Sequence, residues 1–133
     1  MAPNELRYNP THEWASLDDN RVRVGITAFA VSEIKDIVYV DLPAVGTATT
    51  AAASFGAIES VKAAFDLYAP VTGTITAVNG ALTGAPETVS QDPTGAGWMI
   101  EITVPDVATA RTELAGLLDA AAYAAHCAAQ HKH

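Results

Sequence analysis

The sequence predicts a β-rich protein, a sandwich or flattened barrel with short helices and a C-terminal helical segment. Short runs of β-branched or alternating residues recur along the chain, Gly and Pro separate them, and the composition changes to Ala and Leu after Pro105. At 133 residues the chain has the length of one domain. We expect a core over about residues 6–104 and a helical segment over about residues 106–130.

The first elements follow from periodicity and turn chemistry. Residues 21–26 (RVRVGI) alternate in the way that is typical of a half-buried strand. Residues 28–35 have loose helical spacing, and Thr27 is placed to cap a short helix. Residues 36–42 (DIVYVDL) are β-branched and aromatic and stop at Pro43, which predicts a second strand.

The middle of the chain predicts further strands. Residues 47–54 are low in complexity and fit either a loop or a weak strand. Residues 55–60 and 65–79 have strand composition, and Pro70 and Gly73 mark a bend or bulge in the second run. A hairpin between these two runs would place residues 61–63 at its tip.

The last third mixes a loop, a strand and helices. We expect a loop over residues 84–97 with one helical turn after Pro86, followed by an alternating strand over residues 98–104. An apolar helical stripe then appears, and Asp119 is placed to start a second helical segment. The residues of the stripe are Leu114, Leu117, Leu118, Ala121, Ala122 and Ala125.

Composition excludes several classes of function. The formal net charge of -8 disfavours binding to nucleic acid or to anionic membrane surfaces. The single cysteine, Cys127, cannot form an internal disulfide. No signal or transit peptide and no apolar run of membrane-spanning length is visible, so we expect a cytoplasmic protein. The spacing of the C-terminal histidines fits no compact zinc signature, so no metal site is expected.

Lys62, one of three lysines, lies within the mostly apolar stretch AIESVKAAFDLYAP. Its neighbours Val61 and Ala63 would let another protein approach, and Glu59 and Asp66 bracket it. The acids could pair with the lysine or serve as recognition marks for an enzyme. Local physics alone leaves a solvated turn lysine and a lysine displayed for chemistry as equal alternatives.

Segments spread over nearly the whole chain resemble the glycine cleavage system H-protein family. The stretch ESVKAAFDLYAPVTGTI is similar to the lipoyl-attachment segment of that family. Other segments resemble family segments in the same order: YNPTHEW, VGITAFA, DIVYVDLPAVG, VNGAL, GAGWMIEI and LLDAAAYAAH. One lysine between small residues is a weak signal, whereas the ordered set is specific.

This resemblance implies a fold, a cofactor and partners. The fold would be that of the biotinyl/lipoyl domains, with two small antiparallel sheets and lipoate in amide linkage on Lys62 at a hairpin. The protein would carry an aminomethyl group from a pyridoxal-phosphate glycine decarboxylase (P-protein) to a tetrahydrofolate-dependent aminomethyltransferase (T-protein). Dihydrolipoyl dehydrogenase (L-protein) would receive the electrons, and a lipoylating enzyme would recognise the hairpin through Glu59 and Asp66. The chain itself would not be a catalyst, and a monomer is expected.

A cleft that shelters the loaded arm is a further implication of the resemblance. Carried over to this sequence, its residues would be Thr11, Glu13 and Asp66, with a carboxylate beside the aminomethyl amine. Trp14 is either a wall of that cleft or a core aromatic.

Some positions depart from the family pattern, and other functions compete. Phe65 stands where the family has a small hydroxyl residue, and Lys35 where Gly is frequent. A relay that passes lipoyl groups to other acceptor domains would use the same lysine. A biotin carrier is disfavoured because its lysine is usually flanked by Met. A hydrolase using His12 and Glu13 lacks a nucleophile.

Overall fold

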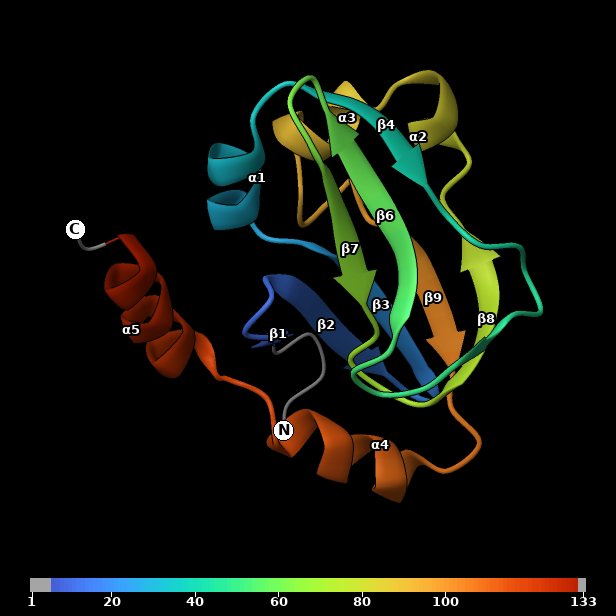
Figure 1. Ribbon diagram of the computed structural model, residues 1–133. Helices are drawn as coiled ribbons and strands as arrows, with labels where there is room; N and C mark the ends of the chain where they lie inside the picture. Colours follow the sequence, from blue (N-terminus) through green and yellow to red (C-terminus); the bar gives the residue numbers. More distant parts are fainter. Residues whose placement is uncertain (1–5, 132–133) are drawn as a thin grey trace.

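The computed structural model describes residues 6–131 and shows two antiparallel sheets packed against each other (Figure 1). The larger sheet has six strands in the order β1-β2-β3-β9-β8-β5, and the smaller has three in the order β4-β6-β7. The strands are β1 Leu6–Tyr8, β2 Glu13–Asp18, β3 Arg21–Ile26, β4 Ile37–Asp41, β5 Ala48–Thr49, β6 Ser54–Ser60, β7 Ala64–Tyr68, β8 Gly73–Val78 and β9 Ile100–Thr103. The predicted fold class is confirmed as a sandwich, and neither sheet closes into a barrel.

The predicted strand over residues 21–26 is confirmed as β3, which lies between β2 and β9 in the larger sheet. Val22 and Val24 are fully buried in the core, while Arg21 and Arg23 point outward. The alternation in the sequence therefore reflects one covered face and one exposed face.

The sequence did not predict β1 or β2, and packing explains why. In β2, Ala15 and Leu17 face the core, while Trp14 is 1% exposed on the other side. The Trp14 indole N–H donates to the Pro93 carbonyl at 2.9 Å, so the chain before β9 covers this face. Because both faces of β2 are covered along part of its length, the polar–apolar alternation that identifies a strand is missing.

The run over residues 65–79 forms two strands in different sheets, β7 and β8. The chain crosses between the sheets at residues 69–72; Pro70 lies in this crossing and Gly73 begins β8, so the predicted bend lies where the chain changes sheets. A Cβ at Gly73 would lie 2.6 Å from the Thr103 carbonyl oxygen, so glycine is required for the close approach of β8 to β9.

The helices are α1 Ala28–Ile34, α2 Ala81–Gly84, α3 Glu87–Gln91, α4 Val107–Ala115 and α5 Ala120–His131. The Thr27 hydroxyl accepts the Ala30 N–H at 3.1 Å, which confirms the predicted cap of α1. Lys35 ends this helix with φ of 55°, the left-handed region that glycine adopts without strain. This conformation explains why glycine would suit position 35.

The second half of the chain carries one helix more than the sequence predicted, because α2 precedes the expected turn after Pro86. Asp106 caps α4, and the Asp119 carboxylate accepts the Ala122 N–H at 2.8 Å at the start of α5. Within residues 6–131, no helix is long and apolar enough to cross a membrane.

Candidate functional site

The predicted hairpin around Lys62 is formed by β6 and β7, which pair from Glu59↔Ala64 onward. The Ser60 side chain organises the turn: its hydroxyl accepts the backbone N–H groups of Lys62 and Ala63 at 3.2 and 3.1 Å. The Ser60 N–H donates to the Ala63 carbonyl at 2.8 Å and closes the connection. A serine hydroxyl that satisfies backbone groups in this way shapes a turn that remains in solvent.

Lys62 is exposed at the tip of this hairpin. Among the residues that the structure describes, it forms no ion pair, so the suggested pairing with Glu59 or Asp66 is not found. Val61 beside it is 72% exposed and Ala63 is small. The amine is therefore free, and its neighbours leave room for an approaching enzyme.

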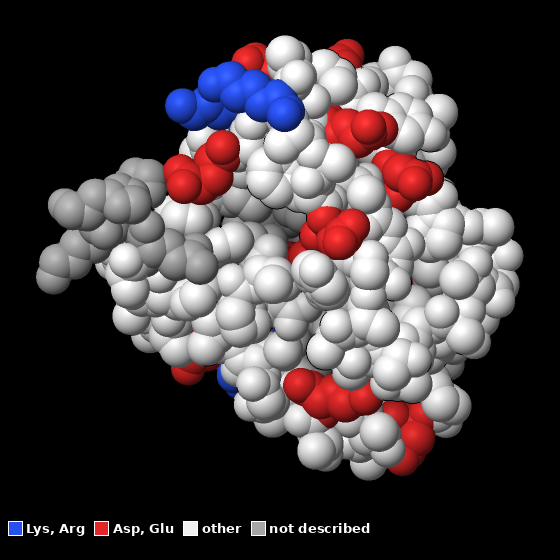
Figure 2. Space-filling model, in the orientation of Figure 1, with Lys and Arg blue, Asp and Glu red and all other residues white. Residues whose placement is uncertain are grey.

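Figure 2 shows the charge distribution on the face that carries the hairpin. Basic residues gather at the end of the molecule where the hairpin tip and α1 lie, and acidic residues lie both beside them and further along this face. Glu59 and Asp66 are both exposed and lie on the same side of the β6–β7 pair, because Ala57 pairs with Asp66 and Glu59 with Ala64. The lysine thus lies at the border of an acidic surface.

A cleft of about 520 Å³ runs along the β7 edge of the smaller sheet. Four segments line it: residues 10–13 at the end of the β1–β2 loop and the start of β2, Ile26 at the end of β3, one face of α1, and residues 64–68 of β7. A smaller hollow of about 140 Å³ contains Lys62, and Glu33 and Ile34 of α1 line both cavities. The surface is therefore continuous from the lysine into the cleft.

Glu13 is the buried carboxylate of the cleft, with 1% of its surface exposed. Its Oε1 accepts hydrogen bonds from the Thr11 hydroxyl and the Asn9 side-chain amide, and its Oε2 accepts the Tyr68 backbone N–H at 3.0 Å. Burial raises the pKa of the Glu13 carboxyl, and these hydrogen bonds oppose the rise. The carboxylate joins the β1–β2 loop to the end of β7.

The three residues proposed for the cleft, Thr11, Glu13 and Asp66, all line it. Asp66 is exposed at the β7 edge, whereas Glu13 lies inside with its oxygens already accepting hydrogen bonds. Glu59 lies outside the lining of the cleft. Trp14 also lies outside it, so its suggested role as a cleft wall is wrong and its alternative as a buried aromatic is correct.

Sequence reasoning missed two aromatic side chains of the cleft. Phe29 on α1 and Phe65 on β7 both line it, and Phe65 remains 41% exposed. Phe65 pairs with Ile58, whose side chain faces the core, so Phe65 points to the inner side of the edge strand. The unusual ring at position 65 therefore contributes apolar surface to the cleft.

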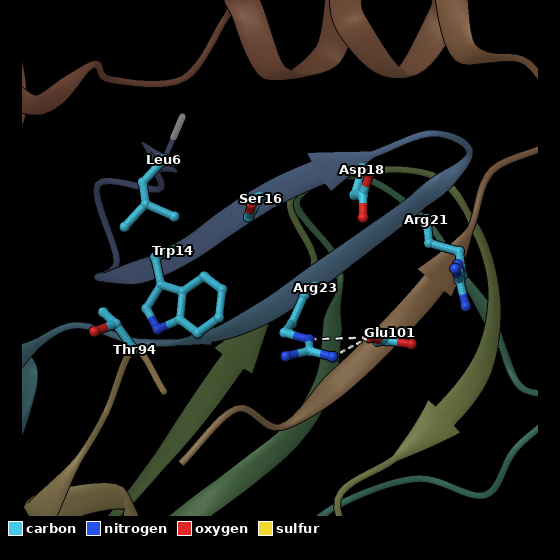
Figure 3. A pocket seen from close by; sticks show the side chains of 8 residues that line it. All are labelled: Leu6, Trp14, Ser16, Asp18, Arg21, Arg23, Thr94 and Glu101. Atoms are coloured by element: carbon cyan, nitrogen blue, oxygen red, sulfur yellow. Dashed lines mark hydrogen bonds and ion pairs between the residues drawn. The ribbon is translucent and has the colours of Figure 1, made fainter. Parts of the chain in front are cut away.

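A second cavity, of about 590 Å³, lies on the outer face of the larger sheet and shares no lining residue with the cleft (Figure 3). Its polar rim is formed by two arginines and two acids. Arg23 donates to Glu101 through Nε and Nη2 at 2.9 and 2.7 Å, and its guanidinium lies 4.9 Å from the centre of the Trp98 ring. None of the described residues that line this cavity lines the cleft or the hollow at Lys62, so this cavity is not part of the site. Among residues 6–129, whose side chains the structure describes, no cluster of His, Cys, Asp and Glu could hold a metal ion.

Comparison with known proteins identifies the family. Residues 6–130 match the family model described as glycine cleavage H-protein. The chain belongs to the glycine cleavage H-protein family. Proteins of this family carry lipoate, and membership gives this chain the role of a carrier component of the glycine cleavage system.

Individual members of the glycine cleavage H-protein family are similar over most of their length. The glycine cleavage system H protein of Mycobacterium avium (strain 104) is 51% identical over 122 residues, which cover 91% of this chain and 92% of that protein. The corresponding protein of Mycobacterium leprae (strain TN) is 48% identical over the same shares. The crystal structure of a glycine cleavage system H protein from Mycobacterium marinum superimposes with a TM-score of 0.81 at 38% identity, covering 93% of this chain and 97% of that one.

Proposed function

We propose that Lys62 carries lipoate in amide linkage and that the chain shuttles an aminomethyl group between enzymes of glycine breakdown. The observation that carries this proposal is the free Lys62 amine at a hairpin tip whose surface continues into the cleft. The donor of the group would be the glycine decarboxylase (P-protein), and the acceptor the aminomethyltransferase (T-protein). Electrons would go to dihydrolipoyl dehydrogenase (L-protein).

The residues around Lys62 fit the attachment of lipoate. An amine that forms no ion pair can be acylated without breaking a contact, and the Ser60 hydroxyl holds the backbone of the turn in place. Acylation removes the charge of the side chain and leaves a long arm on a fixed base. The bound lipoate supplies a dithiolane that accepts the carried group and the electrons, and the protein supplies reach and shelter.

The cleft would shelter the arm between visits to the enzymes. Its apolar walls, which include Phe29 and Phe65, suit a hydrocarbon chain, and Asp66 at the rim suits a protonated amine. Thr11 and Glu13 complete the proposed site from inside the cleft. Because the oxygens of Glu13 already accept hydrogen bonds, its contribution would be the shape and the negative potential of this wall.

Glu59 and Asp66 are the proposed recognition marks for the lipoylating enzyme, since both are exposed on one side of the hairpin. We propose that the chain acts as a single carrier domain without catalytic activity of its own. A monomer suits a shuttle that visits several active sites, and we place it in the cytoplasm with the enzymes it serves.

The test is the intact mass of the full chain after incubation with a lipoylating enzyme, ATP and lipoate. We expect one lipoyl group on the wild type and none on Lys62→Arg, whereas Lys35→Arg, which changes another lysine that lines the small hollow, should be modified normally. A modified Lys62→Arg variant, or an unmodified wild type, would disprove the attachment site. Glycine-dependent bicarbonate exchange with a cognate decarboxylase then separates the shuttle from a lipoyl relay, because a relay would not support the exchange.

A further inference from the structure

Tyr123 of α5 lies between two segments that form the cleft. Its ring stacks on Tyr8 with the ring centres 4.4 Å apart and the planes inclined by 10°. Its hydroxyl lies 2.6 Å from the Thr27 hydroxyl and 2.8 Å from Nδ1 of His12. One phenolic oxygen therefore contacts the two residues that directly flank the Glu13↔Ile26 pair at the end of the β2–β3 ladder.

These two contacts lead to two adjoining walls of the cleft, which also meet directly: the Thr27 N–H donates to the His12 carbonyl at 3.1 Å, and the His12 and Phe29 rings lie 4.9 Å apart. His12 belongs to the β1–β2 loop, which lines the cleft with residues 10–12. Thr27 caps α1 by accepting the Ala30 N–H, and α1 supplies the adjoining wall, including Phe29. A continuous hydrogen-bonded path thus runs from the first turn of α1 through Tyr123 to the loop.

The loop itself needs support from outside. His12 has φ of 81°, a conformation that non-glycine residues seldom adopt and that persists where surrounding contacts impose it. A second residue of α5 contributes, since Nε2 of His126 donates to the Pro10 carbonyl at 2.8 Å. The backbone groups of Tyr8 and Leu118 also exchange hydrogen bonds at 2.8 and 2.9 Å, which fixes the start of α5 to β1.

We propose that Tyr123 is a positioning residue that holds the corner of the cleft where the β1–β2 loop meets α1, because its hydroxyl adds a side-chain link to the backbone hydrogen bond between Thr27 and His12. The contacts of Tyr123 support the structural part of this inference by themselves. Its consequence, the shelter of the loaded arm, rests on the proposed function. The C-terminal helix then supports the site from behind, although none of its described residues lines the cleft.

The experiment uses the full chain with Tyr123→Phe, which keeps the stacked ring and removes only the hydroxyl. Tyr8→Phe is the matched control, because it removes a hydroxyl from the same stack, and this hydroxyl makes no hydrogen bond to any residue that the structure describes. Hydrogen exchange of the unlipoylated protein is measured in peptides that cover residues 9–13 and 27–34. The loss of one hydrogen bond is worth about 1 kcal/mol, so exchange in both segments should be about fivefold faster in Tyr123→Phe and unchanged in Tyr8→Phe.

A second readout measures function in the lipoylated, loaded protein. Release of methylamine should be about fivefold faster in Tyr123→Phe, while the rate of lipoylation at Lys62 stays the same, since the hairpin is not touched. Wild-type exchange in the two segments would overturn the proposal. Faster exchange that extends to β9 would also overturn it, because that pattern means global destabilisation. Faster exchange in the two segments with an unchanged rate of methylamine release would overturn it as well. If no variant accepts lipoate, the attachment at Lys62 has failed, and the exchange data still decide whether Tyr123 joins the walls.

Discussion

Replacing Glu13 by Gln tests whether burial or hydrogen bonding has the larger effect on the pKa of this carboxyl. The change keeps the size of the side chain and one accepting oxygen, but the new amide nitrogen cannot accept the Tyr68 N–H that Oε2 accepts at 3.0 Å. Removing the acceptor of one largely buried donor costs about 1–3 kcal/mol of unfolding free energy. We therefore expect a folded variant that is less stable than the wild type by that amount in mild acid.

The pH dependence of this difference has a defined sign. Burial raises the pKa of the Glu13 carboxyl above its ordinary value of 4.5, so the native state binds the proton more tightly than the unfolded state. The contribution of Glu13 to stability is therefore full below pH 4.5 and is lost as the pH rises through the raised pKa. Gln cannot ionise and has no such loss. The stability gap between wild type and variant should narrow as the pH rises, by at most about 1.4 kcal/mol per pH unit because one proton is involved.

The assay is urea unfolding at several pH values between mild acid and neutrality, with Glu87→Gln as the control. Glu87 is exposed, so its variant should show no comparable change of the gap with pH. A gap that widens toward neutral pH would refute the reasoning. It would mean that the three hydrogen bonds to Glu13 outweigh its burial and that the carboxyl has a lowered pKa.

Three further substitutions test other parts of the structure. Gly25→Ala would place a Cβ 2.7 Å from Nε1 of Trp14, so thermal unfolding should show a free energy of unfolding lower by about 1–3 kcal/mol. In the control Gly84→Ala the new Cβ meets nothing within 4 Å, and the loss should be less than about 0.5 kcal/mol. Ser60→Ala removes the hydroxyl that shapes the turn, so intact-mass time courses should show lipoylation slowed about fivefold at an unchanged melting temperature. Arg23→Ala breaks an exposed ion pair and should lower the urea unfolding free energy by only about 0.2–1 kcal/mol.

Short patterns in the sequence predicted the elements that are determined by alternation, helix capping or strand composition within one segment. The alternation in residues 21–26 marked β3, Thr27 marked the start of α1, and the strand composition on either side of Lys62 marked the hairpin. Each of these signals is contained in about ten residues. The resemblance to a family then singled out Thr11 and Glu13, for which no local pattern had indicated a site.

The remaining features depend on contacts between distant segments. β2 was missed because Pro93 covers the outer face on which Trp14 lies. The hydrogen bond from Tyr68 to Glu13 spans 55 residues, and that between Tyr123 and His12 spans 111. No pattern in one short segment can reveal such pairs, because each partner alone resembles an ordinary polar or aromatic residue.

The position of β9 in the larger sheet governs when the site can form during folding. β3 pairs with β9 in the register Val24↔Ile100, which closes a loop of more than half the chain, whereas β6 and β7 are joined by three residues. Non-local pairings form slowly, and an isolated two-stranded hairpin is only marginally stable in water. The displayed lysine and the cleft should therefore appear together, when the last strand docks. A nascent chain that ends before β9 would offer a lipoylating enzyme neither a stable hairpin nor a sheltered arm.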